Sequence, residues 1–246
     1  MDGYLPETYG ETWADIYDDA FPLHAPAMID FLASLAGSPP RAFELAIGTG
    51  RVAIPLAGAG VDVSGIDISQ AMVDKLREKP GGEEIEVQIG NMAEFEVTDP
   101  FPLVYLPFNT FFALTEQRDQ VSCMKSVYRA LVPGGRFVVQ AFLPDLYRYA
   151  PLGERMSVVS LDSTRGHTYE MATVNPITQR LDVHVVRRNS DGDTEVRPIS
   201  LRYCWPEEMD LMAQIAGLTL ENRWAWYDRS PFGTDSPQHV SVYLKT

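Results

Sequence analysis

The stretch FELAIGTGRVAIPLA, residues 43–57, contains the turn on which the prediction of the fold depends. Its apolar run holds one acidic residue, Glu44, and is followed directly by Gly48 and Gly50. Glycine tolerates φ > 0 and lets a ligand approach the backbone, and the first turn of a helix offers unpaired N–H groups with a partial positive charge. The stretch therefore predicts a strand, a ligand-binding turn and a helix, in that order.

From this turn outward, strand-like and helix-like patterns alternate between residues 41 and 143. Short apolar runs are separated by longer segments with helical periodicity, and glycine or proline ends most of the helical segments. Such alternation is typical of βαβ units, with a parallel sheet and right-handed crossovers. The expected strands are AFELAI (42–47), VDVSGID (61–67), IEVQIG (85–90), FPLVYLPF (101–108) and RFVVQAF (136–142).

The alternation stops after residue 143, and no strong helical pattern occurs up to residue 204. Three segments in this region look like antiparallel strands, and NSDGD (189–193) between the last two is typical of a hairpin turn. The chain therefore carries an inserted antiparallel unit, with expected strands at 167–174, 180–188 and 194–204.

The two ends of the chain complete the predicted fold. Residues 8–19 and 24–36 have helical patterns, and AGSPPRA then breaks the second of them. After the insertion, a helix is expected at 205–218, followed by strands at 218–227 and 239–246. The link between these two strands is too short for a crossover helix, so the last strand should run antiparallel to the sheet.

The composition disfavours several classes of partner. The chain has 20 Lys+Arg against 34 Asp+Glu, a net charge of −14, which argues against nucleic acid and anionic membrane partners. No apolar run approaches the ~20 residues that span a bilayer, and the N-terminus lacks the pattern of a signal peptide. Cys123 and Cys204 fit buried thiols in a reducing compartment, so a cytoplasmic protein is expected. No histidine pair or cysteine cluster has metal-ligand spacing, and no metal is expected.

The acidic residues beside the glycine turn decide which ligand it suits. Gly48-x-Gly50-x-x-Ala53 satisfies a loose dinucleotide fingerprint, and Asp67, at the end of the second expected strand, could accept hydrogen bonds from both hydroxyls of a ribose. The carboxylate of Glu44 would repel a diphosphate, however, and would favour a cationic or amine-bearing ligand.

Four motifs occur in a fixed order: ELAIGTGR (44–51), GIDIS (65–69), GNMAEF (90–95) and LVPGGRFVV (131–139). In this order they resemble class I S-adenosylmethionine-dependent methyltransferases. The resemblance implies an α/β fold with a Rossmann-like, seven-stranded, mainly parallel sheet and an antiparallel last strand. It also implies methyl transfer from S-adenosylmethionine to an O or N atom of a small molecule, as in bacterial secondary metabolism. A non-catalytic protein that binds S-adenosylmethionine or its demethylated product stays open, as does a nicotinamide-dependent oxidoreductase.

The resemblance also implies roles for particular residues. Asp67 would bind the ribose, and Phe108 would lie near the methyl group. Two positions depart from the family pattern: Ala46 stands where the family most often has glycine, and Asn91 stands where many members have aspartate. The implied cofactor-binding residues within the four motifs and beside them are Glu44, Ala46, Gly48, Gly50, Asp67, Ile68, Met72, Asn91, Met92 and Phe108.

Residues outside these motifs are candidates for a lid and for a general base. Tyr9, Trp13 and Tyr17 recur every four residues, and they could either pack as core or, as in the resembling enzymes, fold over the cofactor. His24 and His184 are the candidate bases. We expect a helical lid at 1–40, a cofactor-binding core at 41–143 and 204–246, and an antiparallel β cap over the acceptor site at 144–203. The assembly would be a monomer or a homodimer.

Overall fold

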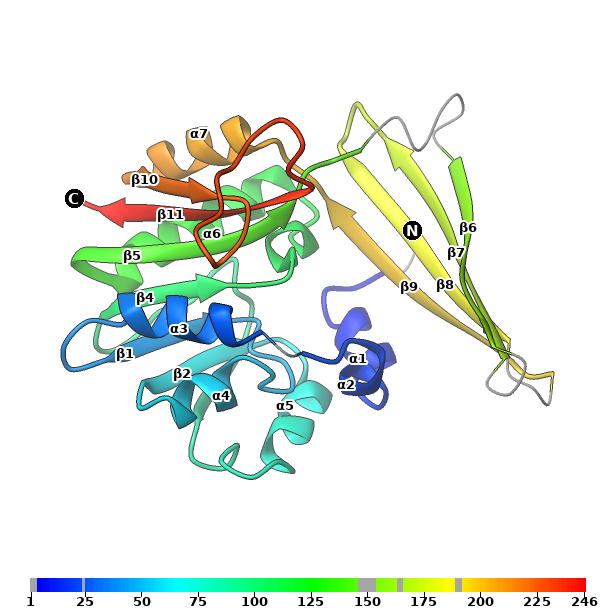
Figure 1. Cartoon of the computed structure of the whole chain (residues 1–246), viewed down its shortest axis with the longest axis horizontal. Coiled ribbons are helices and arrows are strands. Elements are labelled where there is room, and N and C mark those ends of the chain that lie inside the picture. The colour runs from blue at the N-terminus through cyan, green and yellow to red at the C-terminus, as the bar shows by residue number, and fades with distance from the viewer. Residues whose placement is uncertain (1–3, 24, 146–153, 163–165, 189–191) are drawn as a thin grey trace.

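A computed structural model describes residues 4–23, 25–145, 154–162, 166–188 and 192–246 of the chain. It contains two separate sheets, one of seven strands and one of four, with the first two helices between them (Figure 1). The predicted candidate base His24 falls outside the described residues, as does part of the predicted turn at 189–193.

The seven-stranded sheet has the order β10-β11-β5-β4-β1-β2-β3. The pairs among β1 to β5 are parallel, and only β11 runs antiparallel to both of its neighbours, β5 and β10. The predicted mainly parallel sheet with an antiparallel last strand is therefore confirmed. Its strands are β1 Arg41–Leu45, β2 Asp62–Asp67, β3 Glu86–Ile89, β4 Phe101–Leu106, β5 Leu131–Phe142, β10 Leu218–Trp224 and β11 Gln238–Lys245.

Helices cover both faces of this sheet because alternate residues of each strand point to opposite sides. On β1, Phe43 and Leu45 pack in one core cluster with α6 and α7, whereas Ala42 packs in the other with α3 and α4. Ser69 caps α5 by accepting a hydrogen bond from the Met72 N–H. The helices are α3 Pro26–Leu35, α4 Ala53–Gly58, α5 Gln70–Arg77, α6 Gln117–Ala130 and α7 Pro206–Ala216, with the 3₁₀ turn η1 Thr110–Ala113.

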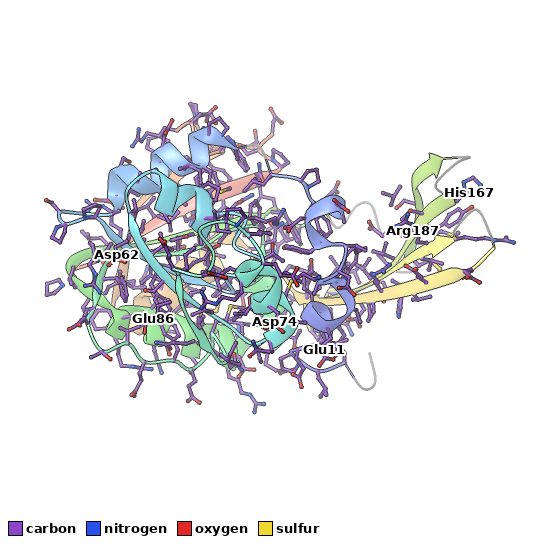
Figure 2. The ribbon with its side chains drawn as sticks, turned by 90° about the horizontal axis from the view of Figure 1, so that it is seen from below. Glu11, Asp62, Asp74, Glu86, His167 and Arg187 are labelled. Atoms are coloured by element: carbon purple, nitrogen blue, oxygen red, sulfur yellow. The ribbon has the colours of Figure 1, made fainter. Side chains whose placement is uncertain are left out.

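The inserted unit is a four-stranded antiparallel sheet in the order β6-β7-β8-β9. The three predicted antiparallel strands are present as β7 Gly166–Asn175, β8 Arg180–Arg188 and β9 Thr194–Arg202. The sequence analysis missed the fourth strand, β6 Glu154–Asp162. Figure 2 shows His167 and Arg187 at the end of this sheet that lies farthest from the core.

The helix predicted at 8–19 is two short helices, α1 Thr8–Trp13 and α2 Tyr17–Ala20, so that prediction was wrong in its continuity. The Arg197 Nε on β9 donates to the Thr12 carbonyl at 3.0 Å, and the Ile16 N–H bonds to the Trp13 carbonyl instead of that of Thr12. A side chain of the inserted sheet thus occupies the Thr12 carbonyl, which in a continuous helix would accept the Ile16 N–H. Contacts with both α5 and β9 place α1 between the core and the insertion (Figure 1).

None of the helices in the described ranges is both long and apolar enough to cross a bilayer.

Candidate active site

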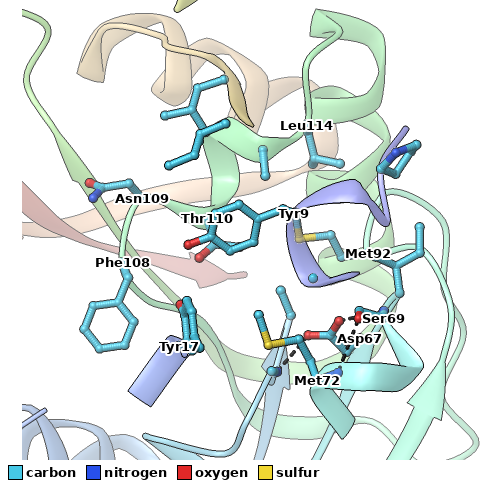
Figure 3. Close-up of a pocket in the computed structure, with 18 of the residues that line it drawn as sticks. Tyr9, Tyr17, Asp67, Ser69, Met72, Met92, Phe108, Asn109, Thr110 and Leu114 are labelled. Atoms are coloured by element: carbon cyan, nitrogen blue, oxygen red, sulfur yellow. Dashed lines mark hydrogen bonds between the residues drawn. The ribbon is translucent and has the colours of Figure 1, made fainter. Parts of the chain in front are cut away.

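A cavity of about 550 Å³ lies where β1, β2, β3 and β4 end, and Figure 3 shows many of its lining side chains. Residues within two positions of the ends of these strands line it, among them Ala46, Ile68, Gly90 and Phe108. The strand order reverses at β1, which has β2 on one side and β4 on the other. Ligands of open α/β sheets bind at such switch points, and the volume is in the range of small-molecule sites.

The turn after β1 has a backbone that glycine suits. Ala46, Gly48 and Gly50 have φ values of +50°, +56° and +74°, which explains why glycine is common at the position of Ala46 in the resembling enzymes. A Cβ added to Gly48 would meet no atom closer than 3.9 Å, so its backbone is open toward the cavity that it lines. A Cβ on Gly50 would come within 3.0 Å of Leu76 on α5, and Gly50 therefore serves helix packing.

The carboxylate of Asp67 is fixed by the backbone of this turn and of α5. Its Oδ2 accepts the Gly48 N–H at 2.7 Å, and its Oδ1 accepts the Ser69 N–H at 2.8 Å. Burial raises the pKa of Asp67 above its usual value, while these two N–H groups act in the opposite direction. Each carboxylate oxygen keeps a further lone pair, so the group can accept hydrogen bonds from a diol such as a ribose.

Glu44 lies behind the turn in an adjoining cavity of about 30 Å³, which it shares with Gly48 and Arg51. The side chain is 2% exposed, and the Tyr105 hydroxyl donates to its Oε2 at 2.8 Å. Burial raises the pKa of Glu44 to about 8, although the Tyr105 hydrogen bond and the charge of Arg51 lower it. The small cavity has room for about one water molecule.

The aromatic residues of the N-terminal segment divide between cavity and core. The rings of Tyr9 and Tyr17 meet edge-on at 6.1 Å, and both line the cavity (Figure 3). The ring of Trp13 stacks on Tyr9 at 5.8 Å, is 3% exposed and lies beneath the guanidinium of Arg197, outside the cavity lining. Trp13 therefore packs as core, whereas Tyr9 and Tyr17 face the cavity, where the cofactor contact stays a prediction.

The structure brings most of the predicted cofactor-binding residues to the main cavity, but not all of the predicted site. Glu44 reaches only the adjoining cavity, and Trp13, Gly50 and His184 line neither. His184 pairs with Pro198 on β9, whereas the next pair, Val183 and Ile199, lies on the opposite face of the sheet, where Ile199 lines the cavity. The predicted residues in the main lining are Tyr9, Tyr17, Ala46, Gly48, Asp67, Ile68, Met72, Asn91, Met92 and Phe108.

Sequence reasoning missed the far side of the cavity. Asn109, at φ +65°, accepts the Phe142 N–H on its Oδ1 at 2.6 Å, so the ends of β4 and β5 are tied together beside Phe108. Arg51 ends the first motif but is not among the residues to which the resemblance gives a role. The lining residues to which the sequence analysis gave no role include Tyr4, Phe21, Arg51, Asn109, Thr110, Leu114, Phe142, Ile199 and Leu201.

Metal chemistry has no support from side-chain clusters. Within the ranges that the structure describes, no group of His, Cys, Asp and Glu side chains could hold a metal ion.

Known proteins are similar to this chain in sequence and in fold. The methyltransferase domain family matches residues 42–135. The CcbJ methyltransferase from Streptomyces caelestis is 37% identical, with a TM-score of 0.91 over 99% of this chain and 100% of that one. The cypemycin N-terminal methyltransferase of a Streptomyces species is 26% identical over 242 residues, which are 96% of this chain and 97% of that protein.

A more distant solved structure agrees in fold. S-adenosylmethionine-bound CalS10, an amino pentose methyltransferase from Micromonospora echinaspora, is 16% identical with a TM-score of 0.63, over 99% of this chain and 93% of that one. The donor set at the turn suits the same cofactor, because it offers carboxylates and an open backbone without a cluster of cations for phosphate. The chain therefore belongs to the class I S-adenosylmethionine-dependent methyltransferases, and S-adenosylmethionine is its cofactor.

Proposed function

We propose that the protein transfers a methyl group from S-adenosylmethionine to a nitrogen or oxygen atom of a small molecule, by in-line displacement, in bacterial secondary metabolism. The observation that carries this proposal is the single cavity that combines the cofactor side, at Asp67 and Gly48, with a second wall from β9 and η1. When bound, S-adenosylmethionine supplies a methyl group on a sulfonium leaving group. The protein's task is then to orient the acceptor, because good alignment of two reactants greatly increases the rate of the reaction between them.

The cofactor side would be divided among the predicted residues. Asp67 would accept the ribose hydroxyls, and Ile68 and Met72 would enclose the adenine, with Asn91 and Met92 at its edge. The Oδ1 of Asn91 already accepts the Ala93 N–H at 2.8 Å and keeps one lone pair for an adenine amine. Glu44 would attract the ammonium of the methionine end through one water molecule, and Phe108 would lie near the methyl group.

The acceptor side favours a compound with an apolar body. Leu114, Phe142, Ile199 and Leu201 form most of this wall, with Thr110 as a polar group among them. A compound of this kind would fill the wall with hydrophobic contacts and use the polar groups for orientation.

Nitrogen is the favoured acceptor atom. A neutral amine can attack before it loses a proton, whereas an ordinary hydroxyl needs a base. Among the described residues that line the main cavity, Asp67 is the one carboxylate. Two N–H groups already donate to it on the cofactor side, so it is not placed to act as a base for a hydroxyl acceptor. The names of the cypemycin N-terminal methyltransferase and of the amino pentose methyltransferase point the same way. His24 remains the predicted base for a hydroxyl acceptor, and the structure does not bring His184 to the cavity.

The proposal extends to the setting of the reaction. The free, buried thiols of Cys123 and Cys204 support a reducing, cytoplasmic location. The net charge of −14 disfavours nucleic acid as the acceptor, and a monomer or a homodimer stays our prediction for the assembly.

The test is methyl transfer to matched pairs of acceptors that differ only in an amine or a hydroxyl group. We expect amines with apolar bodies to yield methylated product by mass spectrometry, together with S-adenosylhomocysteine. Tight binding of S-adenosylmethionine without product across a broad acceptor set would instead support the non-catalytic alternative. Methylation of the hydroxyl partners alone, lost in His24→Gln, would move the proposal to oxygen and to a general base.

A further inference from the structure

The methionine end of S-adenosylmethionine carries a carboxylate as well as an ammonium, and the site must accommodate both charges. Neither Glu44 nor Asp67 offers a positive charge to the carboxylate. Arg51 is the one Lys or Arg among the described residues that line the two adjoining cavities. A buried or half-buried carboxylate without a cationic or hydrogen-bonding partner is costly.

The guanidinium of Arg51 is held firmly in place between two rings. Its Cζ lies 4.5 Å from the ring centroid of Tyr17 and 4.5 Å from that of Phe108. Its Nη2 donates to the Tyr17 hydroxyl at 3.1 Å, and its Nη1 donates to the Phe21 carbonyl. Two of its five N–H groups are thereby used, and the planar fork keeps donors for a carboxylate.

Arg51 also lacks the partner that a structural arginine in so acidic a protein would be expected to have. The chain has 34 acidic residues against 20 basic ones, yet none of the ion pairs found among the described residues includes Arg51, although its charge lowers the pKa of Asp18 and of Glu44. By comparison, Lys79 is paired with Asp18, and Arg136 with Glu221 at 2.7 Å. An oriented cation that forms no ion pair among the described residues, on the wall of the two adjoining cavities, is placed for a ligand contact.

We propose that Arg51 binds the α-carboxylate of S-adenosylmethionine and makes the site selective for cofactors that carry it. The same guanidinium holds Tyr17 and Phe21 of the N-terminal segment, so the carboxylate would lie at the junction between that segment and the glycine turn. The inference concerns cofactor recognition and stands apart from the identity of the acceptor.

A purely structural role for Arg51 is a competing explanation, and Lys79 provides the matched control. Lys79 Nζ donates to the Thr49 carbonyl at 2.7 Å and pairs with Asp18, whose Oδ1 accepts the Thr49 hydroxyl at 2.6 Å. Lys79 therefore ties α2 to the same turn, but it lines neither cavity. Loss of Lys79 should loosen the segment without removing a carboxylate contact.

The experiment compares calorimetric affinities for S-adenosylmethionine and for decarboxylated S-adenosylmethionine. The full-length protein should bind the decarboxylated compound roughly 10- to 100-fold more weakly, the range for loss of a charge-assisted hydrogen bond. Arg51→Met should bind the two compounds with nearly equal affinity. Lys79→Met should weaken both by the same factor and keep the preference. Arg51→Lys, which keeps the charge, should retain part of the preference.

Two results would overturn the proposal. One is wild-type protein that binds both compounds equally well. The other is an Arg51→Met or Arg51→Lys protein, folded by circular dichroism, that keeps the full wild-type preference, because Arg51 would then act only on the N-terminal segment. Since no acceptor is present, neither result depends on the proposed methylation of a small molecule.

Discussion

Glu44 and Tyr105 occupy paired positions on the neighbouring strands β1 and β4, and the Tyr105 hydroxyl donates to Oε2 of Glu44 at 2.8 Å. Both side chains are almost fully buried, and burial raises the pKa of each. One neutral hydrogen-bond donor does not replace the water that a carboxylate loses on burial. The ionised form of Glu44 is therefore less stable in the folded protein than in the unfolded chain, unless a cation compensates it.

This relationship predicts how Glu44 makes stability depend on pH. The pKa of Glu44 is about 8 in the folded protein and 4.5 in its unperturbed state. The folded state thus binds the proton more tightly than the unfolded chain does. The contribution of protonated Glu44 to the free energy of unfolding is therefore fully present below pH 4.5 and is lost as the pH rises to about 8. Compared with Glu44→Gln, which stays neutral and can still accept from Tyr105, the wild type should lose stability over this interval, on the order of a few kcal/mol.

Urea unfolding of both proteins at several pH values measures that difference, and the pairwise comparison cancels the other titrating groups. A difference in unfolding free energy that stays constant with pH would show that Glu44 has an ordinary pKa.

Asp67→Asn should weaken the binding of S-adenosylmethionine by about 10-fold or more, because the ribose hydroxyls would lose a charged acceptor. Asparagine keeps one oxygen for the N–H groups of Gly48 and Ser69, so it disturbs the turn less than alanine would. Asp62→Asn is the control, since Asp62 lies at the start of the same strand with an exposed side chain. Calorimetry that finds equal affinity in wild type and Asp67→Asn would refute the ribose assignment.

Gly48→Val should abolish cofactor binding while the fold persists. The branched side chain would extend into the cavity and would be strained at φ +56°, at a cost of about 1–2 kcal/mol. Gly60→Val carries a similar strain at φ +90°, with open space around its Cβ and no place in the cavity lining. Both variants should melt at lower temperature, but only Gly60→Val should still be stabilised by S-adenosylmethionine. Stabilisation of both would make the glycine turn merely structural.

Hydrogen exchange of residues 8–19 should slow when S-adenosylmethionine binds, because Tyr9 and Tyr17 line the cavity and the N-terminal segment meets the turn through Asp18 and Arg51. Deletion of residues 1–20 should leave a folded core that retains the cofactor poorly and turns over little. Amides of α6 serve as the internal reference, because α6 packs against the sheet in the core cluster that contains Phe43 and contributes no residue to the cavity lining. Exchange in 8–19 that is already slow and unaltered by ligand would assign the segment to ordinary core packing.

The extent to which this fold could be predicted follows from how local its signals are. The alternation at 41–142 was interpreted correctly because each strand and helix carries its own periodicity and its own glycine or proline stop. The break in the first helix could not be found in this way. It depends on Arg197 and Thr12, which are 185 residues apart in the chain, and no local pattern announces such a contact.

The same distinction separates the two sides of the site. Gly48, Asp67 and Asn91 lie at the carboxyl ends of parallel strands or in the turns that follow them, where chain order alone brings side chains to one edge of the sheet. Ile199 and Leu201 reach the cavity only because the inserted sheet folds back toward the core. His184 lies outside the cavity lining for a related reason: alternation along β8 fixes its face, whereas the sequence does not show which face meets the core.

The way in which the four-stranded sheet joins the core has an evolutionary consequence. It enters after β5 and returns into α7, both at the edge of the parallel sheet where the cavity lies, and it contributes Ile199 and Leu201 but none of the glycine turn (Figure 1). We expect the segment to be exchangeable as a unit, provided that a graft keeps the contact between Arg197 and Thr12. Grafting the corresponding segment of a relative onto this core would replace one wall of the binding pocket in a single step, so that new acceptors can be acquired by recombination while the inherited cofactor machinery is left as it is.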